Sequence, residues 1–337
     1  MKNKPIIIWL LLGCFLIFVM VVIGGITRLT DSGLSMVNWN LFMGVIPPLN
    51  NAEWLETFAQ YQQSPEGRKL NYNISLSEFK FIFFWEYLHR MMGRLLGLVF
   101  IIPFTVFIIR GQLNKKLLKQ TIILLFLGSL QGAIGWWMVK SGLVDNPHVS
   151  HYRLSVHLII AFLTCAFTFW VALPLMFNKN RPGNIKIKKL LLIYFFTVII
   201  QIIYGAFVAG LDAGGGYNTW PKMLGEWVPA AVYMDVNGYN PKWFIEHIWG
   251  VQFIHRTLGI LVLGFTFYVW NKIRNSKPDV QQIKSSSLLL VLMITQTILG
   301  ISTLIYSAPL FLALMHQITA FFIIMTTVYC IFLFKKA

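Results

Sequence analysis

The chain has 337 residues, of which 57% are hydrophobic and only 12% are charged, a composition that excludes an ordinary water-soluble domain. Its formal net charge of +16 is compatible with a nucleic acid or a membrane surface as its partner. The positions of the charges along the chain decide between these two.

Eight apolar runs are each long enough to cross a bilayer, for which a helix needs about 20 residues. In chain order they cover residues 6–27, 82–109, 117–139, 152–177, 188–211, 249–273, 286–307 and 309–334. The longest connections are residues 28–81 and 212–248, and no soluble domain remains once the spans are assigned. No small-residue cleavage site follows the first span, so we expect it to be retained. The sequence therefore predicts an all-α integral membrane protein.

Basic residues gather on one side of these predicted spans. With a cytoplasmic N-terminus, the inner segments hold 17 Lys and Arg residues against one acid, Asp279, whereas the outer segments hold eight basic and ten acidic residues. This positive-inside bias predicts a bacterial cytoplasmic (inner) membrane protein with both termini in the cytoplasm. The basic excess indicates contact with anionic membrane lipid, and we expect no nucleic acid partner.

The two halves of the sequence repeat one another. Several rare residues match in order: Gly24, Asp31 and Gly33 with Gly205, Asp212 and Gly214; EYLHRMMG with QFIHRTLG; Gln131 and Gly135 with Gln296 and Gly300; His157 with His316. Short connections within each half favour two duplicated four-helix bundles, one formed by residues 1–180 and the other by residues 181–337.

One histidine lies in each of the second, fourth, sixth and eighth predicted spans: His89, His157, His255 and His316. These four spans all run from outside to inside, so the four imidazoles share the outer leaflet. An imidazole in hydrocarbon needs a strong partner, and a pair of facing imidazoles can hold a heme iron. A single such histidine has a simpler explanation, a packed side chain bonded to a carbonyl, but the symmetric set of four favours two hemes.

The other three histidines, His148, His151 and His247, fall in outer loops or at the entrances of spans, where we expect them to be solvated or interfacial. The three cysteines, Cys14, Cys165 and Cys330, all fall inside predicted spans, so no structural disulfide is expected.

Charges inside the predicted spans are costly and point to function. Arg90 and Arg256 directly follow His89 and His255 and are candidates for contact with heme propionates, with snorkelling or a structural ion pair as the alternative. Glu86 precedes His89 by three residues and shares its helical face, whereas the second half has glutamine at that position. This asymmetry favours one reacting heme and one helper heme, although an ion pair between Glu86 and Arg90 is the structural alternative.

The outer connections show helix-start signals. Asn50 with Glu53 resembles a capping box that precedes an amphipathic stripe of Trp54, Leu55, Phe58 and Tyr61, which we interpret as an interfacial helix. Ser75 with Glu78 predicts the cap of the second span, and Asn240-Pro241 predicts the start of the sixth.

These motifs together, EYLHR, GGITRLTDSGLSM, NTWPKM, QFIHRTLG and HYRLSVHL, resemble the heme A synthase family over nearly the whole chain. The resemblance implies an oxidoreductase that converts the C8 methyl of heme O into a formyl group, giving heme A for terminal oxidases. It implies Glu86 as the catalytic residue, His89 and His157 as axial ligands of the substrate heme, and His255 and His316 as ligands of a heme B cofactor. The first outer loop lacks the cysteine pair of one branch, so the chain resembles the cysteine-free branch of bacteria and mitochondria.

Heme O synthase, assembly factors of the terminal oxidase and an electron-transfer protein of unknown identity are the partners that this resemblance implies. From the residues alone, two other classes stay open. A di-heme b-type electron-transfer cytochrome would need the same four histidines but gives Glu86 no role. A transporter built from repeats would need a polar path through the midplane, whereas these polar residues cluster near one face.

Overall fold

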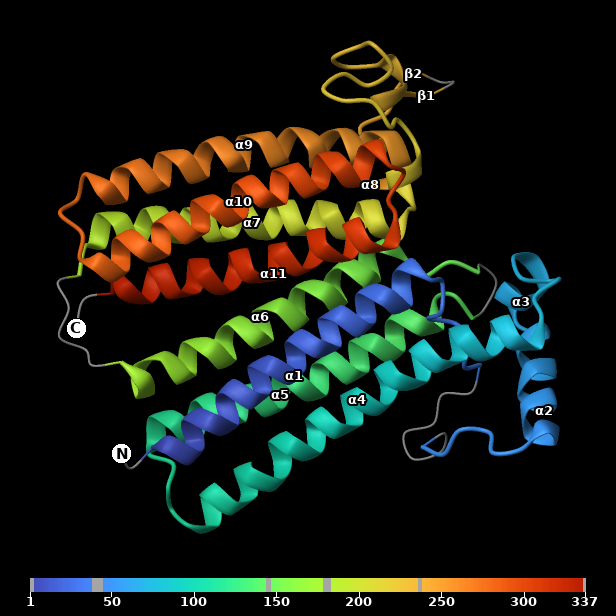
Figure 1. Cartoon of the computed structure of the whole chain (residues 1–337), viewed down its shortest axis with the longest axis horizontal. Coiled ribbons are helices and arrows are strands. Elements are labelled where there is room, and N and C mark those ends of the chain that lie inside the picture. Colours follow the sequence, from blue (N-terminus) through green and yellow to red (C-terminus); the bar gives the residue numbers. More distant parts are fainter. Residues whose placement is uncertain (1–2, 38–44, 144–146, 178–182, 236–237, 336–337) are drawn as a thin grey trace. The chain divides into compact units, whose positions relative to one another are not determined.

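The computed structural model describes residues 3–37, 45–143, 147–177, 183–235 and 238–335 (Figure 1). Within these ranges, eight helices are long and apolar enough to cross a membrane. They are α1 (Lys4–Leu29), α4 (Leu76–Ile109), α5 (Lys115–Lys140), α6 (His151–Met176), α7 (Ile185–Gly210), α9 (Ile248–Arg274), α10 (Val280–Ile305) and α11 (Leu310–Leu333). The prediction of an all-α multi-pass membrane protein is therefore confirmed. Some residues of the charge count, Lys2, Asp145, Lys179, Arg181 and Lys336, lie outside the described ranges.

Polar side chains fix where several of these helices begin. Ser75 and Glu78 form the predicted capping box of α4, in which the Ser75 hydroxyl accepts from the Glu78 amide and the Glu78 carboxylate accepts from the Ser75 amide. Asp279 and Gln282 form the same box at the start of α10. Such caps satisfy backbone donors that the first turn of a helix leaves unpaired.

The connection between α1 and α4 contains two short helices, α2 (Asn51–Gln62) and α3 (Pro65–Lys69). The predicted cap of α2 is present, since the Asn50 side chain accepts from the Glu53 amide at 3.0 Å. Its apolar stripe packs on the start of α4, with Phe58 and Tyr61 5.1 and 5.0 Å from Phe79 between ring centroids. Leu55 departs from the predicted stripe, because its side chain is 56% exposed.

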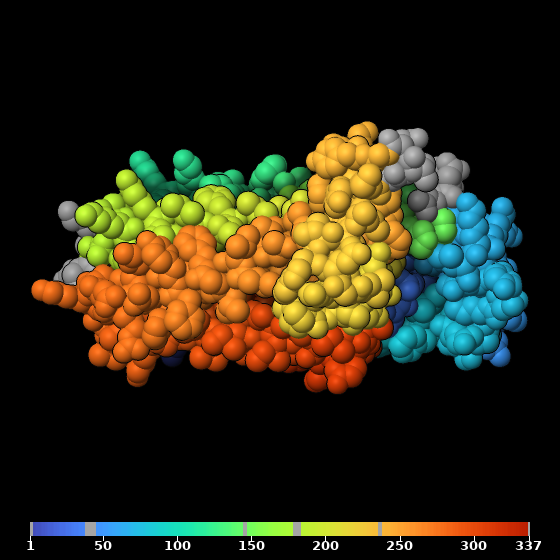
Figure 2. Space-filling model, turned by 90° about the horizontal axis from the view of Figure 1, so that it is seen from above, coloured from blue at the N-terminus to red at the C-terminus, as the bar shows by residue number. Residues whose placement is uncertain are grey.

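The connection between α7 and α9 contains only short elements: η1 (Ala213–Gly215), η2 (Ala230–Val232), the antiparallel strands β1 (Met234–Asp235) and β2 (Gly238–Tyr239), and α8 (Trp243–Glu246). Figure 2 shows this connection, in yellow and light orange, gathered at one end of α9. The prediction that Asn240-Pro241 starts the sixth span is wrong. Asn240 instead accepts from the Lys242 amide just before α8, and His247 caps α9, because the backbone turns out of α8 at that residue.

The four long helices of the second half enclose a common core. Helix α7 packs against α9 and α11, and α10 packs against the same two helices, which closes a four-helix bundle (Figure 1). Buried side chains of these helices, among them Leu191, Val262 and Leu289, contribute to its core.

In the first half, α4 packs against α5, while α1 meets α4 at Gly24 and α5 meets α6 at Gly135. By contacts, the chain forms two compact units, Phe15–Ala161 and Met1–Cys14 with Phe162–Ala337. The division into duplicated halves at residues 1–180 and 181–337 concerns the sequence repeat and stays a prediction.

One local feature agrees with the repeat. Asp31 and Asp212 each lie two residues after the end of a long helix, α1 and α7, and both adopt the left-handed backbone conformation, with φ of 48° and 51°. Aspartate tolerates this conformation better than most residues, and a left-handed residue after a helix is a common way to end it. The matched aspartates thus turn the chain in the same way in both halves.

Candidate functional site

Each of the four histidines predicted as heme ligands lies against a glycine of the preceding long helix. A β-carbon added to Gly24 would lie 2.8 Å from Cε1 of His89, and one added to Gly300 would lie 2.8 Å from Cε1 of His316. The same distance is 3.1 Å for Gly135 with His157 and for Gly205 with His255. Real β-carbons essentially never approach other atoms closer than 3.0 Å. The glycines therefore make room for the imidazole rings, once in each pair of consecutive long helices.

The two histidines of the second half come together. The ring centroids of His255 and His316 are 6.3 Å apart, and both residues belong to the same compact unit. Metal–imidazole bonds of about 2.0–2.1 Å, added to the short distance from ring nitrogen to centroid, place two axial imidazoles about 6.4 Å apart. Their separation therefore fits a heme iron between them.

Unpaired ring nitrogens support the same interpretation. Nδ1 of His316 and Nδ1 of His89 are buried and have no hydrogen-bond partner. A buried polar atom without a partner is costly and calls for an explanation, of which a bound ligand or ion is one. Among the described residues, no three of His, Cys, Asp and Glu come together as a metal site. A pair of imidazoles such as His255 and His316 is the donor set of a bis-histidine heme.

Glutamines accompany three of the four histidines. Nε2 of Gln131 lies 3.2 Å from Nδ1 of His157, Nε2 of Gln201 lies 3.1 Å from Nδ1 of His255, and Nε2 of Gln296 lies 3.2 Å from Nε2 of His316. Gln131 and Gln296 match in the sequence repeat, but no role was predicted for either of them, and Gln201 was not predicted at all. The signal was present as a repeated Gln-x-x-x-Gly spacing, since each glutamine precedes its ring-facing glycine by four residues.

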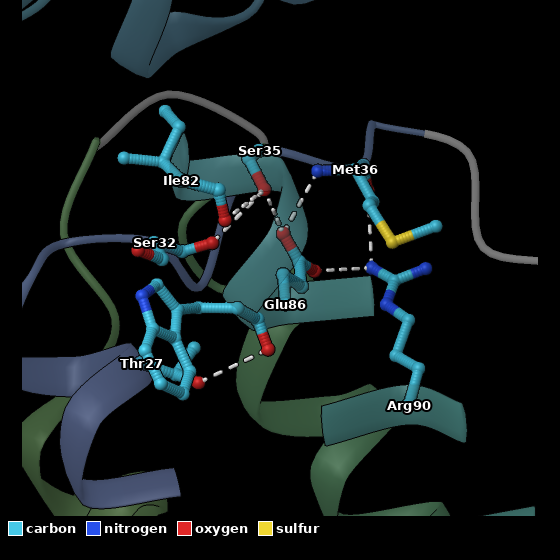
Figure 3. Close-up of polar contacts among 8 residues, drawn as sticks. Thr27, Ser32, Ser35, Met36, Ile82, Glu86 and Arg90 are labelled. Carbon is cyan, nitrogen blue, oxygen red and sulfur yellow. Dashed lines mark hydrogen bonds and ion pairs between the residues drawn. The ribbon is translucent and has the colours of Figure 1, made fainter. Parts of the chain in front are cut away.

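Glu86 is buried, with 3% of its surface exposed, and both carboxylate oxygens are engaged (Figure 3). Its Oε2 accepts from the Ser35 hydroxyl at 2.7 Å and from the Met36 amide at 2.8 Å, while its Oε1 contacts the Arg90 guanidinium. The ion pair considered as the structural alternative is therefore present. Ser35 and Met36 were missed as partners, because nothing in the local sequence of either segment indicates a contact over some 50 residues of chain.

In the second half, the residues that match Glu86 and Arg90 bind the connection between α7 and α9. Gln252, which replaces Glu86, donates to the backbone oxygen of Ala213 at 2.8 Å. Arg256 donates to the backbone oxygen of Tyr217, as Arg90 donates to that of Met36. Residues 36 and 217 match in the repeat, so both arginines bind the outer connection at the same point.

The candidate propionate residues thus have other contacts. Arg256 also donates to the backbone oxygens of Thr219 and Pro221, at 2.7 and 3.1 Å, and its guanidinium lies over the Trp220 ring. These contacts hold each guanidinium at the connection that follows the first long helix of its own half.

None of the three remaining histidines is a contact of the ring-facing glycines, and His148 is exposed in the connection between α5 and α6. His247 caps α9 and stacks on Trp243, with ring centroids 3.7 Å apart, and burial lowers its pKa. His151 begins α6 and lies against Tyr152.

The chain was compared with known proteins. A family model described as cytochrome oxidase assembly protein matches residues 7–328. A heme A synthase of Flavobacterium psychrophilum is 46% identical over 338 residues, covering 99% of each chain. A heme A synthase of Flavobacterium johnsoniae is 44% identical with the same coverage, and one of Nitrosospira multiformis is 45% identical over 94% of this chain and 89% of that protein.

Proposed function

Because the chain belongs to the cytochrome oxidase assembly protein family, we propose that it is a heme A synthase, an oxidoreductase that converts heme O to heme A. The observation that carries the proposal beyond family membership is the set of four ring-facing glycines, each opposite one of the four histidines. Two pairs of imidazoles are a donor set that can hold the irons of two porphyrins.

The second half would hold a resident heme B between His255 and His316. Bound there, the heme would supply electron transfer, the chemistry that the protein itself lacks. The chain contributes the two ligands at the fitting separation of 6.3 Å, the space made by Gly205 and Gly300, and a covering bundle of apolar helices that excludes water.

The first half would bind the substrate, heme O, through His89 and His157. Glu86 is the catalytic residue of this proposal, because its carboxylate lies on α4 one turn from His89 and the second half has an amide at the matching position. Oxidation of a methyl group to a formyl group releases protons, and a buried carboxylate can accept one at Oε1 or Oε2. Arg90, which contacts Oε1 of Glu86, would keep that carboxylate oriented.

Arg90 and Arg256 would meet the propionates of the two hemes, since a guanidinium suits a carboxylate geometrically. The protein would lie in the bacterial inner membrane with both termini in the cytoplasm, as the charge asymmetry indicates, and would exchange heme with heme O synthase and with assembly factors of the terminal oxidase.

The experiment is an analysis of extracted heme. The full-length protein is expressed in a strain that makes heme O but lacks a heme A synthase, and the hemes of its membranes are separated. Heme A, or its hydroxylated precursor, is the expected product. The variants His89→Ala and His157→Ala should abolish it, whereas His148→Ala, a change in an outer loop, should not. Heme B without any heme O product would instead favour a di-heme electron carrier and would overturn the proposal.

A further inference from the structure

Three of the four helices that carry a ring-facing glycine also carry a glutamine one turn before it. The pairs are Gln131 and Gly135 in α5, Gln201 and Gly205 in α7, and Gln296 and Gly300 in α10. Residues four apart lie on one face of a helix, so each glutamine reaches the ring that its glycine accommodates. Helix α1 breaks the pattern, because the residue four before Gly24 is Met20.

The structure places Met20 where the second half has Gln201. A β-carbon added to Gly259, one turn after His255, would lie 3.4 Å from Nε2 of Gln201. A β-carbon added to the matching Gly93, one turn after His89, would lie 3.7 Å from Cε of Met20. His89 is thus the one ligand candidate with a thioether in place of an amide. Its Nδ1 has no hydrogen-bond partner; Nδ1 of His316 has none either, but there Gln296 lies beside the other ring nitrogen, Nε2.

The three glutamines have an unused acceptor. Oε1 of Gln131, of Gln201 and of Gln296 is buried and has no hydrogen-bond partner, although each Nε2 lies beside a ring nitrogen. Nε2 of Gln131 and of Gln201 also donates to the backbone oxygen of the same histidine, at 2.9 and 3.0 Å. A histidine that binds iron through one nitrogen carries a proton on the other, and an acceptor for that proton fixes the ring and raises its basicity as a ligand. A half-turn of the amide, which for Gln131 and Gln201 exchanges the Nε2 bond to the histidine backbone for a bond to the ring, would present Oε1 to that proton. A thioether is only a weak acceptor.

We propose that Gln131, Gln201 and Gln296 are positioning residues, each of which holds the ring nitrogen of an axial histidine that does not bind iron. We propose also that Met20 leaves His89 as the weakest of the four ligands. The inference rests on the proposed function. A resident heme must stay through every turnover, so both of its histidines are held by glutamines. A substrate heme must enter and leave, so one of its two histidines is left without such support.

The first test transfers the pattern of α1 to the second half. In the purified full-length protein, Gln201→Met should raise the midpoint potential of heme B, let carbon monoxide bind the reduced heme by displacing His255, and weaken heme retention about 10-fold or more. Thr197→Met, which adds the same side chain one turn earlier on the same face of α7, should behave as the unaltered protein. A Gln201→Met protein with the potential and carbon monoxide reactivity of the unaltered protein would overturn the inference.

The second test makes the opposite change. Met20→Gln gives His89 the amide that His255 has, so more heme O and heme A should copurify per protein while their release slows. No gain in bound substrate or product would overturn the assignment of Met20, and this variant decides the matter if Gln201→Met does not accumulate. Unaltered protein that holds heme B but makes no heme A would overturn the proposed function alone, because the Gln201→Met measurements do not depend on turnover. Unaltered protein without heme B would overturn both.

Discussion

At the scale of single residues, the absence of a side chain is as informative as its presence. The glycines opposite the histidines lie inside long helices, each five residues before the last residue, where glycine costs about 0.5–1 kcal/mol relative to alanine. Other glycines inside the long helices, such as Gly264, have open space beside them, whereas these four each face an imidazole. The space that each glycine leaves for an imidazole ring explains why glycine occurs at that position.

We therefore expect opposite results from two changes of glycine to alanine in the second half. Gly300→Ala would place a methyl group 2.8 Å from Cε1 of His316, so the ring must move and heme B should be lost or become high-spin. Gly264→Ala is the matched control, since a β-carbon there meets nothing within 4 Å and the helix gains alanine. Absorbance of heme B per protein, measured after purification, checks both. Equal heme content in the two variants would contradict the role assigned to Gly300.

Glu86 has two roles to separate: its carboxylate accepts hydrogen bonds that hold the chain, and it is the proposed proton acceptor. Three donors, from Ser35, Met36 and Arg90, point at its two oxygens. Glu86→Gln replaces one oxygen by a donor, which faces another donor and costs about 1–3 kcal/mol. We expect a lower yield, normal heme B, and heme A formation per protein reduced about 100-fold or more if the carboxylate accepts a proton.

Two further variants separate the roles of this carboxylate. Ser35→Ala removes one bond to the outer connection but keeps the acid, so yield should fall while heme A per protein persists. Gln252→Glu changes the matching position beside the resident heme and should leave product formation nearly intact. Extracted heme O, its hydroxylated intermediate and heme A are measured for each variant. Normal heme A per protein from Glu86→Gln would remove Glu86 from catalysis.

At the scale of elements, α2 and α3 form a small folded cover at the start of α4. Its centre is polar: the Tyr61 hydroxyl donates to Glu66 at 3.1 Å, and the Asn71 amide donates to the Tyr61 oxygen at 2.7 Å. Glu66 is only 4% exposed, and burial raises its pKa from an ordinary 4.5 to about 8. Burial also raises the pKa of Tyr61, and the carboxylate of Glu66 adds to that effect.

This buried acid makes the stability of the cover depend on pH. A carboxyl whose pKa is raised on folding stabilises the fold when protonated, so the contribution is complete below about pH 4.5 and is lost as the pH rises through about 8. Amide hydrogen exchange of residues 51–69, corrected for its intrinsic pH dependence, should show weaker protection at pH 9 than at pH 6. In Glu66→Gln, the protection should not change between these pH values. The same loss of protection in both proteins would show that Glu66 is not its cause.

Local sequence signals predicted the elements well and the contacts between them poorly. The eight spans follow from apolar length, and the starts of α2 and α4 follow from Asn50 and Ser75, because a cap involves only neighbouring residues. Asn240-Pro241 led to the wrong start for the sixth span, because the same sequence signal can precede a short helix, here α8, as well as a long one. The bonds from Ser35 and Met36 to Glu86 could not be predicted, because they join segments whose approach is set by the packing of whole helices.

At the scale of the whole molecule, the repeat explains why differences between the halves carry information. Matched histidines, glycines and arginines make the same contacts in both halves, so they report what two porphyrin sites have in common. Glu86 opposite Gln252 and Met20 opposite Gln201 are two differences beside a predicted ligand. Both differences fall in the first half, around His89, which is where a substrate rather than a resident heme would bind.

The direction in which the chain crosses the membrane decides which side these sites face. With 17 basic residues and one acid on the predicted inner side, against eight and ten on the outer side, both termini should be cytoplasmic and all four histidines should lie in the outer leaflet. A reporter that is active only in the cytoplasm should therefore be active when fused after residue 337 and inactive when fused after residue 230. A fusion after Gln112, in the short inner connection between α4 and α5, is the control for an active fusion within the chain. The reverse pattern would place the histidines near the cytoplasmic face, so heme O would have to reach its site from that side of the membrane.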